Sequence, residues 1–285
     1  MKRNILALIL TIAGSAQAAT TIHTTNKNAY GANVGWINAQ GDITNGAVIG
    51  QAFCTGYVWS ASCGWISLGN GPTNGWQYSN LSSNDWGVNH DGEGRLTGYA
   101  YGANIGWINF EQTHGQPKIN LLTGNLSGYV YGANIGWISL SNAQAYVKST
   151  LSAGPDTDGD GIPDPWERRR VGNTTSLGNG DYDGDRVPDA DEYAADTDPD
   201  DSNDRFRIVS LQTLPGTNTV SWTARPTRLY RLEATNRLAS TSGGWVDAGG
   251  GLIGPPASSP ASATVPTGGA TSRFYRVQAV VPLTE

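Results

Sequence analysis

The sequence predicts a mainly β protein in three parts: an N-terminal array of β-hairpin repeats, an acidic connector with short helices, and a C-terminal β-sandwich. Three observations predict this. A segment rich in aromatic residues and glycine recurs four times within residues 19–150, two acidic twelve-residue segments lie within residues 151–204, and short alternating strands recur within residues 205–285. Charge follows the same division, because the middle part has a net charge of −12 and the last part is basic at +5.

The N-terminus has the pattern of a secretory signal peptide. Lys2 and Arg3 precede an apolar stretch that is too short to span a bilayer, and Ala16 and Ala18 are the small residues of a cleavage site. We therefore expect residues 1–18 to be removed and the mature chain to be secreted or held at the cell surface. No second apolar run follows, so we expect no membrane-spanning segment.

Each copy of the N-terminal repeat predicts a β-hairpin. In the third copy, Tyr99 and Tyr101 share one face of a first strand, residues 102–104 form the turn, and residues 105–110 form the return strand. A leading strand, such as residues 118–122, precedes the hairpin in the last two units. A unit of this size cannot bury its face alone, so the copies should share one core. The copies are residues 28–38, 57–67, 99–109 and 129–139, with an insertion at residues 69–93.

The aromatic residues of the repeats have two interpretations: they fill the shared core, or they form an exposed platform for a polysaccharide. Leu, Ile and Val are scarce here, so we expect the repeat tryptophans to be core residues. Trp76 and Trp86 lie in the polar insertion and lack strand periodicity, which makes them better candidates for a surface site. The repeat tryptophans are Trp36, Trp65, Trp107 and Trp137.

Cys54 and Cys63 are the two cysteines of the chain, and both belong to the second repeat. In an exported chain, such an even pair predicts a disulfide, which here would tie the hairpin to the segment before it. Two buried thiols are the alternative.

Two acidic segments, 25 positions apart, have the ligand spacing of a calcium loop. Each has acidic residues at positions 1, 3, 5, 9 and 12 and, at position 7, an apolar residue whose carbonyl would coordinate the ion. Two carboxylates about 4 Å apart repel by roughly 4 kcal/mol at an intermediate dielectric, and a divalent cation turns that repulsion into coordination. The predicted ligands are Asp156, Asp158, Asp160, Ile162, Asp164 and Glu167 in the first loop and Asp181, Asp183, Asp185, Val187, Asp189 and Glu192 in the second.

These loops, with the sequence Ala-Asp-Thr-Asp-Pro at residues 195–199, resemble the thrombospondin type 3 calcium-binding repeats of bacterial secreted proteins. They also resemble EF-hand loops, but the glycine- and proline-rich residues before each loop predict no entering helix. Short exiting helices are expected over residues 165–170 and 190–195. Position 6 is Gly161 in the first loop and Arg186 in the second. The turn there favours glycine, so the second site should bind calcium more weakly.

The sequence leaves open whether three acidic residues after the second loop join a metal site. They are Asp196, Asp198 and Asp200.

Residues 205–285 predict a compact β domain. Strands are expected at residues 207–211, 219–222, 229–234 and 274–279, with a Gly/Pro/Ser-rich stretch at residues 249–269. The last of these strands, together with Trp222, resembles fibronectin type III domains, which implies a β-sandwich.

No motif of a catalytic site occurs in the chain, so we expect no enzymatic activity. The three histidines are isolated, which predicts surface positions, and the acidic residues of the repeat part form no recognisable catalytic pattern. The acidic chain also argues against a nucleic-acid partner. The residues concerned are His23, His90 and His114, and Asp85, Asp91, Glu93 and Glu111.

Two hypotheses of function follow. In the first, two calcium loops rigidify the link between two β domains of an exported structural or adhesion protein, whose partner is a cell-surface polysaccharide or a matrix protein. In the second, the aromatic repeats form a lectin-like carbohydrate-binding module.

Overall fold

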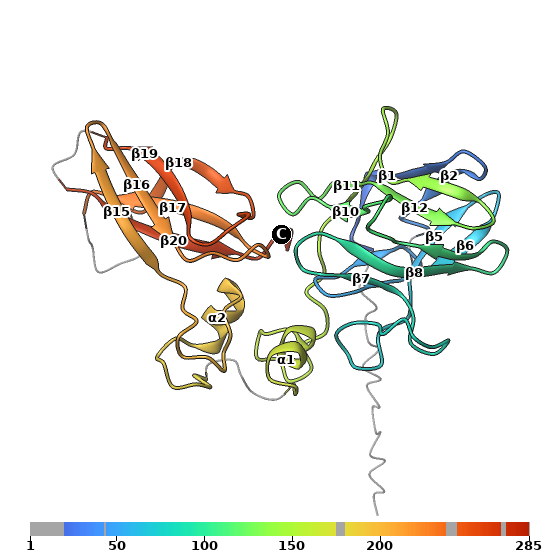
Figure 1. Ribbon diagram of the computed structural model, residues 1–285, viewed down its shortest axis with the longest axis horizontal. Coiled ribbons are helices and arrows are strands. Elements are labelled where there is room, and N and C mark those ends of the chain that lie inside the picture. The colour runs from blue at the N-terminus through green and yellow to red at the C-terminus, as the bar shows by residue number, and fades with distance from the viewer. Residues whose placement is uncertain (1–19, 43, 175–179, 238–243, 269–271, 285) are drawn as a thin grey trace, which may run out of the picture.

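The computed structural model describes residues 20–42, 44–174, 180–237, 244–268 and 272–284, and every structural statement below concerns these residues. The expected signal peptide, residues 1–18, lies outside them. The described chain is mainly β, as the sequence predicts: two β domains lie side by side, with two short helices beside their junction (Figure 1). No helix among the described residues is long and apolar enough to cross a membrane.

The N-terminal domain is a closed barrel of eight antiparallel strands, made of four hairpins that each correspond to one sequence repeat. Neighbouring hairpins are shifted along one another. The pairing shows this shift: Tyr30 lies opposite Trp36 within the first hairpin and opposite Ser139 of the fourth hairpin. The shift recurs at the other junctions and gives the strand tilt that closes a barrel. The hairpins are β1 (Ile22–Gly31) with β2 (Gly35–Asn38), β5 (Tyr57–Ser60) with β6 (Gly64–Ser67), β8 (Leu96–Gly102) with β9 (Gly106–Asn109), and β12 (Tyr129–Gly132) with β13 (Gly136–Ser139).

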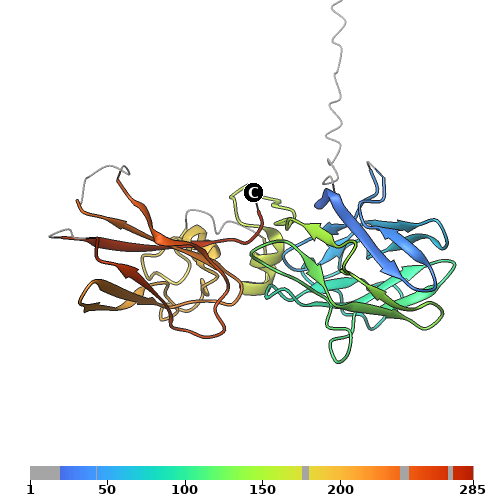
Figure 2. The same ribbon diagram turned by 90° about the horizontal axis from the view of Figure 1, so that it is seen from above.

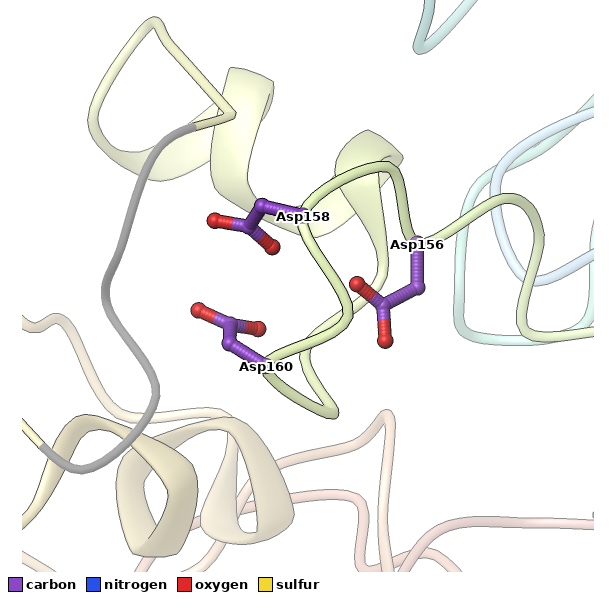
Figure 3. A group of neighbouring side chains, drawn as sticks. All are labelled: Asp156, Asp158 and Asp160. Atoms are coloured by element: carbon purple, nitrogen blue, oxygen red, sulfur yellow. The ribbon is translucent and has the colours of Figure 1, made fainter.

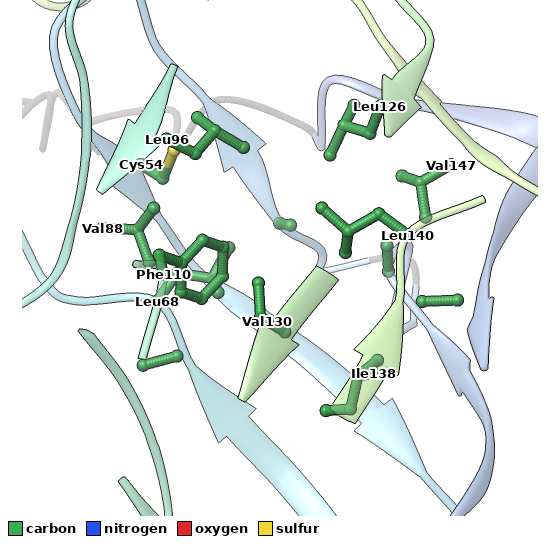
Figure 4. Close-up of a cluster of buried hydrophobic side chains, with 14 of the residues drawn as sticks. Cys54, Leu68, Val88, Leu96, Phe110, Leu126, Val130, Ile138, Leu140 and Val147 are labelled. Carbon is green, nitrogen blue, oxygen red and sulfur yellow. The ribbon is translucent and has the colours of Figure 1, made fainter. Parts of the chain in front are cut away.

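Small and branched apolar side chains fill the inside of the barrel (Figure 4). Ala29 and Ile37 face each other across the first hairpin and are buried, and Val130 and Ile138 occupy the same places in the fourth. Phe110, which follows β9, joins the same cluster. The interior of an eight-stranded barrel is just wide enough for side chains to fill it, so residues of this size suffice.

The four repeat tryptophans lie on the outside of the barrel, so the prediction that they form the core is wrong. They are 41–51% exposed. Side chains alternate between the two faces of a strand, and the alternation itself does not tell which face is inside. The narrow interior decides this, because it accommodates Ala, Val and Ile, and the bulky rings at the alternate positions then face outward.

The turns of the hairpins bond to one another in a ring around one end of the barrel. In three hairpins the turn asparagine donates from Nδ2 to a backbone carbonyl in the turn of a neighbouring hairpin, at 3.0–3.1 Å. In the second hairpin, Ser60 Oγ donates to the carbonyl of Val34 instead. Each turn ends in left-handed backbone, with a φ of +72° at Gly35, which explains the glycine before each tryptophan. The asparagine bonds run from Asn33 to Ile135, from Asn104 to Cys63 and from Asn134 to Ile105.

Short strands lie around the barrel. β14 (Val147–Ser149) pairs with β1, and β7 (Val88–His90), which lies within the insertion, pairs with β8. The leading strand expected at residues 118–122 is shorter than predicted: β10 (Lys118–Ile119) pairs with β11 (Leu126–Ser127), and Lys118 also forms a bridge with Arg95. β3 (Val48–Ile49) pairs with β4 (Cys54–Thr55).

Cys54 and Cys63 are separate buried thiols, so the predicted disulfide is not formed. Cys54 lies in β4, ahead of strand β5, and Cys63 lies in the turn that follows β5. A strand rises about 3.3 Å per residue, so β5 keeps the two cysteines at its opposite ends, beyond the roughly 7 Å between Cα atoms that a disulfide tolerates. Both residues belong to the apolar core, and burial raises the pKa of the Cys54 thiol to about 12.

The C-terminal domain is a sandwich of two three-stranded sheets, as the sequence predicts, and Figure 2 shows it beside the barrel. Trp222 and Tyr230 are fully buried in its core. Two strands lie largely where the sequence indicates loops, because their Gly, Ala and Ser residues give no strand signal, and pairing with their neighbours forms them. The sheets are β15 (Ile208–Leu214), β16 (Thr217–Trp222) and β19 (Ala261–Pro266), and β17 (Leu229–Thr235), β18 (Val246–Ile253) and β20 (Phe274–Val280).

The two β domains contact each other directly as well as through the connector. Leu229 of β17 is buried in the core cluster of the barrel, and Leu283 packs against that cluster. The backbone amide of Leu151 donates to the carbonyl of Leu283 at 2.8 Å. The connector helices, α1 (Asp164–Arg170) and α2 (Asp189–Ala195), lie beside this junction and agree with the predicted exiting helices to within a residue (Figure 1).

Candidate metal centres

The first acidic loop brings three carboxylates together. Asp156, Asp158 and Asp160 project from one loop (Figure 3), and each offers an oxygen within 4.8 Å of the others. Oxygens that bind one Ca²⁺ at 2.3–2.6 Å lie at most about 5 Å apart. The triad therefore has the chemistry and the spacing of a calcium site, at positions 1, 3 and 5 of the predicted loop.

Backbone amides hold this loop in shape. Asp156 accepts the amide of Gly159 at 2.8 Å through one oxygen and that of Gly161 at 3.0 Å through the other, and Asp160 accepts the amide of Ile162 at 2.8 Å. The side chain of Ile162 is fully buried in a small apolar cluster with Trp166, which anchors the end of the loop. A loop fixed in this way loses little further entropy when an ion binds.

Glu167, at position 12, is the most informative residue of the first site. It lies in the first turn of α1, is fully buried, and has no hydrogen bond to either carboxylate oxygen within the described part of the chain. Burial, and then the charges of Asp160 and Asp158, raise the pKa of Glu167 to about 7. Burying a carboxylate beside other carboxylates raises the free energy of the folded state unless a cation compensates the charge. Position 12 is also where a bidentate calcium ligand is expected.

Asp164, which the sequence predicts as the ligand at position 9, also holds the loop in shape. Its two oxygens accept the backbone amide and the hydroxyl of Thr157 at 2.7 and 2.6 Å. Asp189 has the same place in the second loop and accepts the amide of Tyr182 at 3.0 Å. Neither belongs to the triad of its loop. This fits a position that often reaches calcium only through water.

The second loop repeats the arrangement with two differences. Asp181, Asp183 and Asp185 form its triad, again within 4.8 Å, but Asp185 is also ion-paired with Arg205 Nε at 2.8 Å. Arg186, at position 6, has a φ of +75°, the left-handed conformation that Gly161 adopts in the first loop at +94°. This conformation disfavours a side chain, so the strain predicted for position 6 is present.

Glu192, at position 12 of the second loop, is buried like Glu167. One oxygen accepts the hydroxyl of Thr197 at 3.0 Å, and the other has no partner among the described residues. Burial, opposed by the Thr197 bond and aided by the Asp183 charge, raises the pKa of Glu192 to about 7. At position 12, the second loop therefore leaves one oxygen of Glu192 without a hydrogen bond among the described residues, whereas Glu167 in the first loop leaves both.

Asp196, one of the residues that the sequence left open, is part of the domain junction. Trp166 Nε1 donates to it at 2.9 Å, Arg170 is 3.0 Å away, the hydroxyl of Thr227 donates to it, and Arg228 is 3.9 Å away. Burial raises the pKa of Asp196, but Arg228, the Thr227 bond and Arg170 outweigh burial and lower it to about 2. Asp196 is therefore an ionised structural residue.

The other two residues left open also lie outside the triads. Asp198 lies 3.4 Å from Arg170, and Asp200 is exposed in a turn. Among the described residues, the two loops contain the clusters suited to a metal ion.

Helix α2 is bonded to both β domains. Arg228 of the sandwich donates to the carbonyls of Tyr193 and Ala194 at the end of α2, and Gln51 of the barrel donates to the hydroxyl of Tyr193 at 3.3 Å. Trp166 of α1 packs edge-on against Tyr193, with ring centroids 5.5 Å apart. Both acidic loops are thus joined to the contact between the two β domains. The spacing of acidic residues gives no sign of these contacts.

His90 is buried rather than exposed, so the prediction of a surface position is wrong for this histidine. Its Nδ1 donates to the carbonyl of Gly50 at 2.9 Å, and burial lowers the pKa of the imidazole. The sequence did not reveal this because the segment around His90 is polar, although it pairs with β8. His23 and His114 are exposed, as predicted.

The acidic residues of the barrel are dispersed and mostly brace loops. Asp85 accepts the amides of Thr73 and Ser79 at 3.1 and 2.9 Å. Glu111 accepts three successive backbone amides, and Asp91 is ion-paired with Arg95 at 2.6 Å.

Comparisons with protein-family models, with curated proteins and with solved structures found no significant match to this chain.

Proposed function

We propose that this chain is an exported structural or adhesion protein in which two calcium loops of the thrombospondin type 3 kind hold two β domains in a fixed arrangement. The observation that carries the proposal is Glu167, a fully buried carboxylate with both oxygens unpartnered within the described residues, beside a triad of aspartates. A divalent cation at that point compensates the charges and uses the oxygens.

Calcium binding acts on the domains through the two helices. Glu167 belongs to α1, so an ion shared by Glu167 and the triad holds the loop against that helix. The same helix places Trp166 and Arg170 on Asp196, which follows α2. Arg228 bonds α2 to the sandwich. Without calcium, repulsion among the carboxylates opposes this packing, and with calcium the repulsion becomes coordination.

Titration calorimetry of the mature chain tests the proposal. We expect calcium to bind at two sites, and Glu167→Gln to weaken one of them at least about tenfold, because a bidentate ligand becomes a neutral amide. Asp191→Asn is the matched control: it removes the same charge from an exposed position on α2 and should leave both sites unchanged. Absence of heat at millimolar calcium, or equal losses in the two variants, would contradict the proposal.

Hydrogen exchange then tests the structural role. We expect a calcium chelator to remove protection from the backbone amides of α1 and α2, while the amides of the barrel and sandwich strands stay protected. Unchanged protection in the two helices would mean that calcium has no part in fixing the domains.

A further inference from the structure

The outer face of the barrel carries tyrosine–tryptophan pairs that no part of the calcium mechanism uses. The pairs lie across neighbouring strands: the ring centroids are 5.0 Å apart in the first hairpin, 4.9 Å in the third and 5.0 Å in the fourth. Large exposed apolar patches on a soluble domain commonly mark binding surfaces. The exposed rings are Tyr30, Trp36, Trp59, Trp65, Tyr99, Tyr101, Trp107, Tyr129, Tyr131 and Trp137.

The third hairpin differs from the others because the insertion lies over its rings. Trp86 of the insertion packs edge-on against Trp107, with centroids 5.0 Å apart, and lies 6.0 Å from Tyr101. Together with Tyr99 and Leu81, these tryptophans line an open cleft of about 430 Å³. Ligand pockets typically enclose about 300–1,000 Å³. The insertion thus converts a flat aromatic face into a cleft at one hairpin.

Hydrogen bonds within the insertion hold the cleft in its shape. Asn80 accepts the amide of Gly87 at 3.0 Å through its side chain and donates its own amide to the carbonyl of Asp85 at 3.0 Å. The buried carboxylate of Asp85 fixes two further amides, those of Thr73 and Ser79. A cleft that exists before binding loses little entropy when a ligand enters.

The chemistry of the lining selects one class of ligand. Among the residues that the structure describes, the polar groups that line the cleft are neutral, from Asn80, Ser82 and Ser83, and none of the lining side chains is charged. Phosphates and acidic sugars require basic partners, which the cleft does not offer. A neutral sugar has an apolar C–H face that packs on an indole or phenol ring, and hydroxyl groups that bond to amides and hydroxyls.

We infer that the cleft between Trp86 and Trp107 binds a neutral polysaccharide. The cleft is open, so a chain of sugar units can lie in it and extend beyond it at both ends. This activity is separate from the proposed calcium function, because every residue of the cleft belongs to the barrel or its insertion.

Affinity electrophoresis of the mature chain tests this inference, in gels that contain soluble β-glucan, xylan, galactomannan, alginate or gelatin. We expect at least one of the three neutral polysaccharides to retard the protein, with and without calcium, and alginate and gelatin not to. Trp86→Ala and Trp107→Ala should each weaken the retardation at least about tenfold, as the loss of a central aromatic anchor does.

Trp137→Ala is the matched control. Trp137 has the same place in its repeat as Trp107 and similar exposure, 43% against 46%, but the insertion does not cover it. Its replacement should leave binding within about twofold of the wild type. Leu81→Asp serves as a second variant that cannot disturb the core, because Leu81 is 91% exposed, and it should also weaken binding.

Three results would overturn the inference. The first is no retardation by any neutral polysaccharide. The second is an equal loss in the Trp107 and Trp137 variants, which would assign binding to the whole aromatic face. The third is retardation by alginate or gelatin alone, which would assign the cleft to an acidic sugar or to a protein.

Discussion

The first and second acidic loops have the same ligand spacing but different surroundings. The first has glycine at position 6 and leaves both oxygens of Glu167 for an ion. The second has Arg186 at position 6, an ion pair between Asp185 and Arg205, and one oxygen of Glu192 bonded to Thr197. The comparison teaches that spacing determines where the carboxylates gather, whereas backbone strain and competing partners distinguish two clusters of the same spacing.

The largest expected effect comes from replacing Trp166, whose side chain connects the first loop to the helix that follows the second. Trp166 packs in a small cluster with Ile162 of the first loop and Tyr193 of α2, which follows the second loop, so Trp166→Ala should lower the free energy of unfolding of the calcium-loaded connector by about 3–5 kcal/mol. Chemical denaturation in calcium measures it. Tyr182→Ala, at a 55% exposed position of the second loop, is the control and should change little. A small effect at Trp166 would mean that the loops are independent.

The pH dependence of Asp196 tests the same coupling. The folded pKa is lowered to about 2 from 3.8, so this carboxylate contributes stability that is present above pH 3.8 and is lost as the pH falls through about 2. Asp196→Asn should therefore cost about 2 kcal/mol at pH 5, and the deficit should shrink between pH 3.8 and 2. Denaturation of both proteins at several pH values measures the difference. A deficit that does not change with pH would exclude a charge effect.

Position 6 should account for part of the difference in affinity between the loops. Arg186→Gly relieves left-handed strain of about 1 kcal/mol and should tighten the second site roughly fivefold. The reciprocal Gly161→Arg should weaken the first site by a similar factor. Calorimetry of both variants compares the two sites directly. If neither affinity changes, position 6 is not what distinguishes the loops.

The smallest expected effect comes from the ion pair of the second loop. Arg205 is partly exposed, and such pairs contribute less than about 1 kcal/mol, so Arg205→Ala should tighten the second site only a few-fold. Arg207→Ala removes the same charge from an exposed neighbouring position and serves as the control. Equal gains in both variants would point to general electrostatics rather than to the pair.

Local patterns in the sequence determined much of this protein. Alternation and turn residues predicted four hairpins and a sandwich, and the acidic spacing predicted two loops, each followed by a short helix. These features depend on residues that are close in the chain, so the sequence displays them directly.

The tertiary structure decided what depends on distant residues. Closure of the barrel put the tryptophans outside. The packing of the sandwich against the connector places Arg228 near Asp196, which is also ion-paired with Arg170, whereas the sequence left open whether Asp196 binds a metal. The physical reason is the same in both cases. Contacts between segments far apart in the sequence determine which face of a strand is buried and which charge is paired, and the local spacing of residues does not predict those contacts.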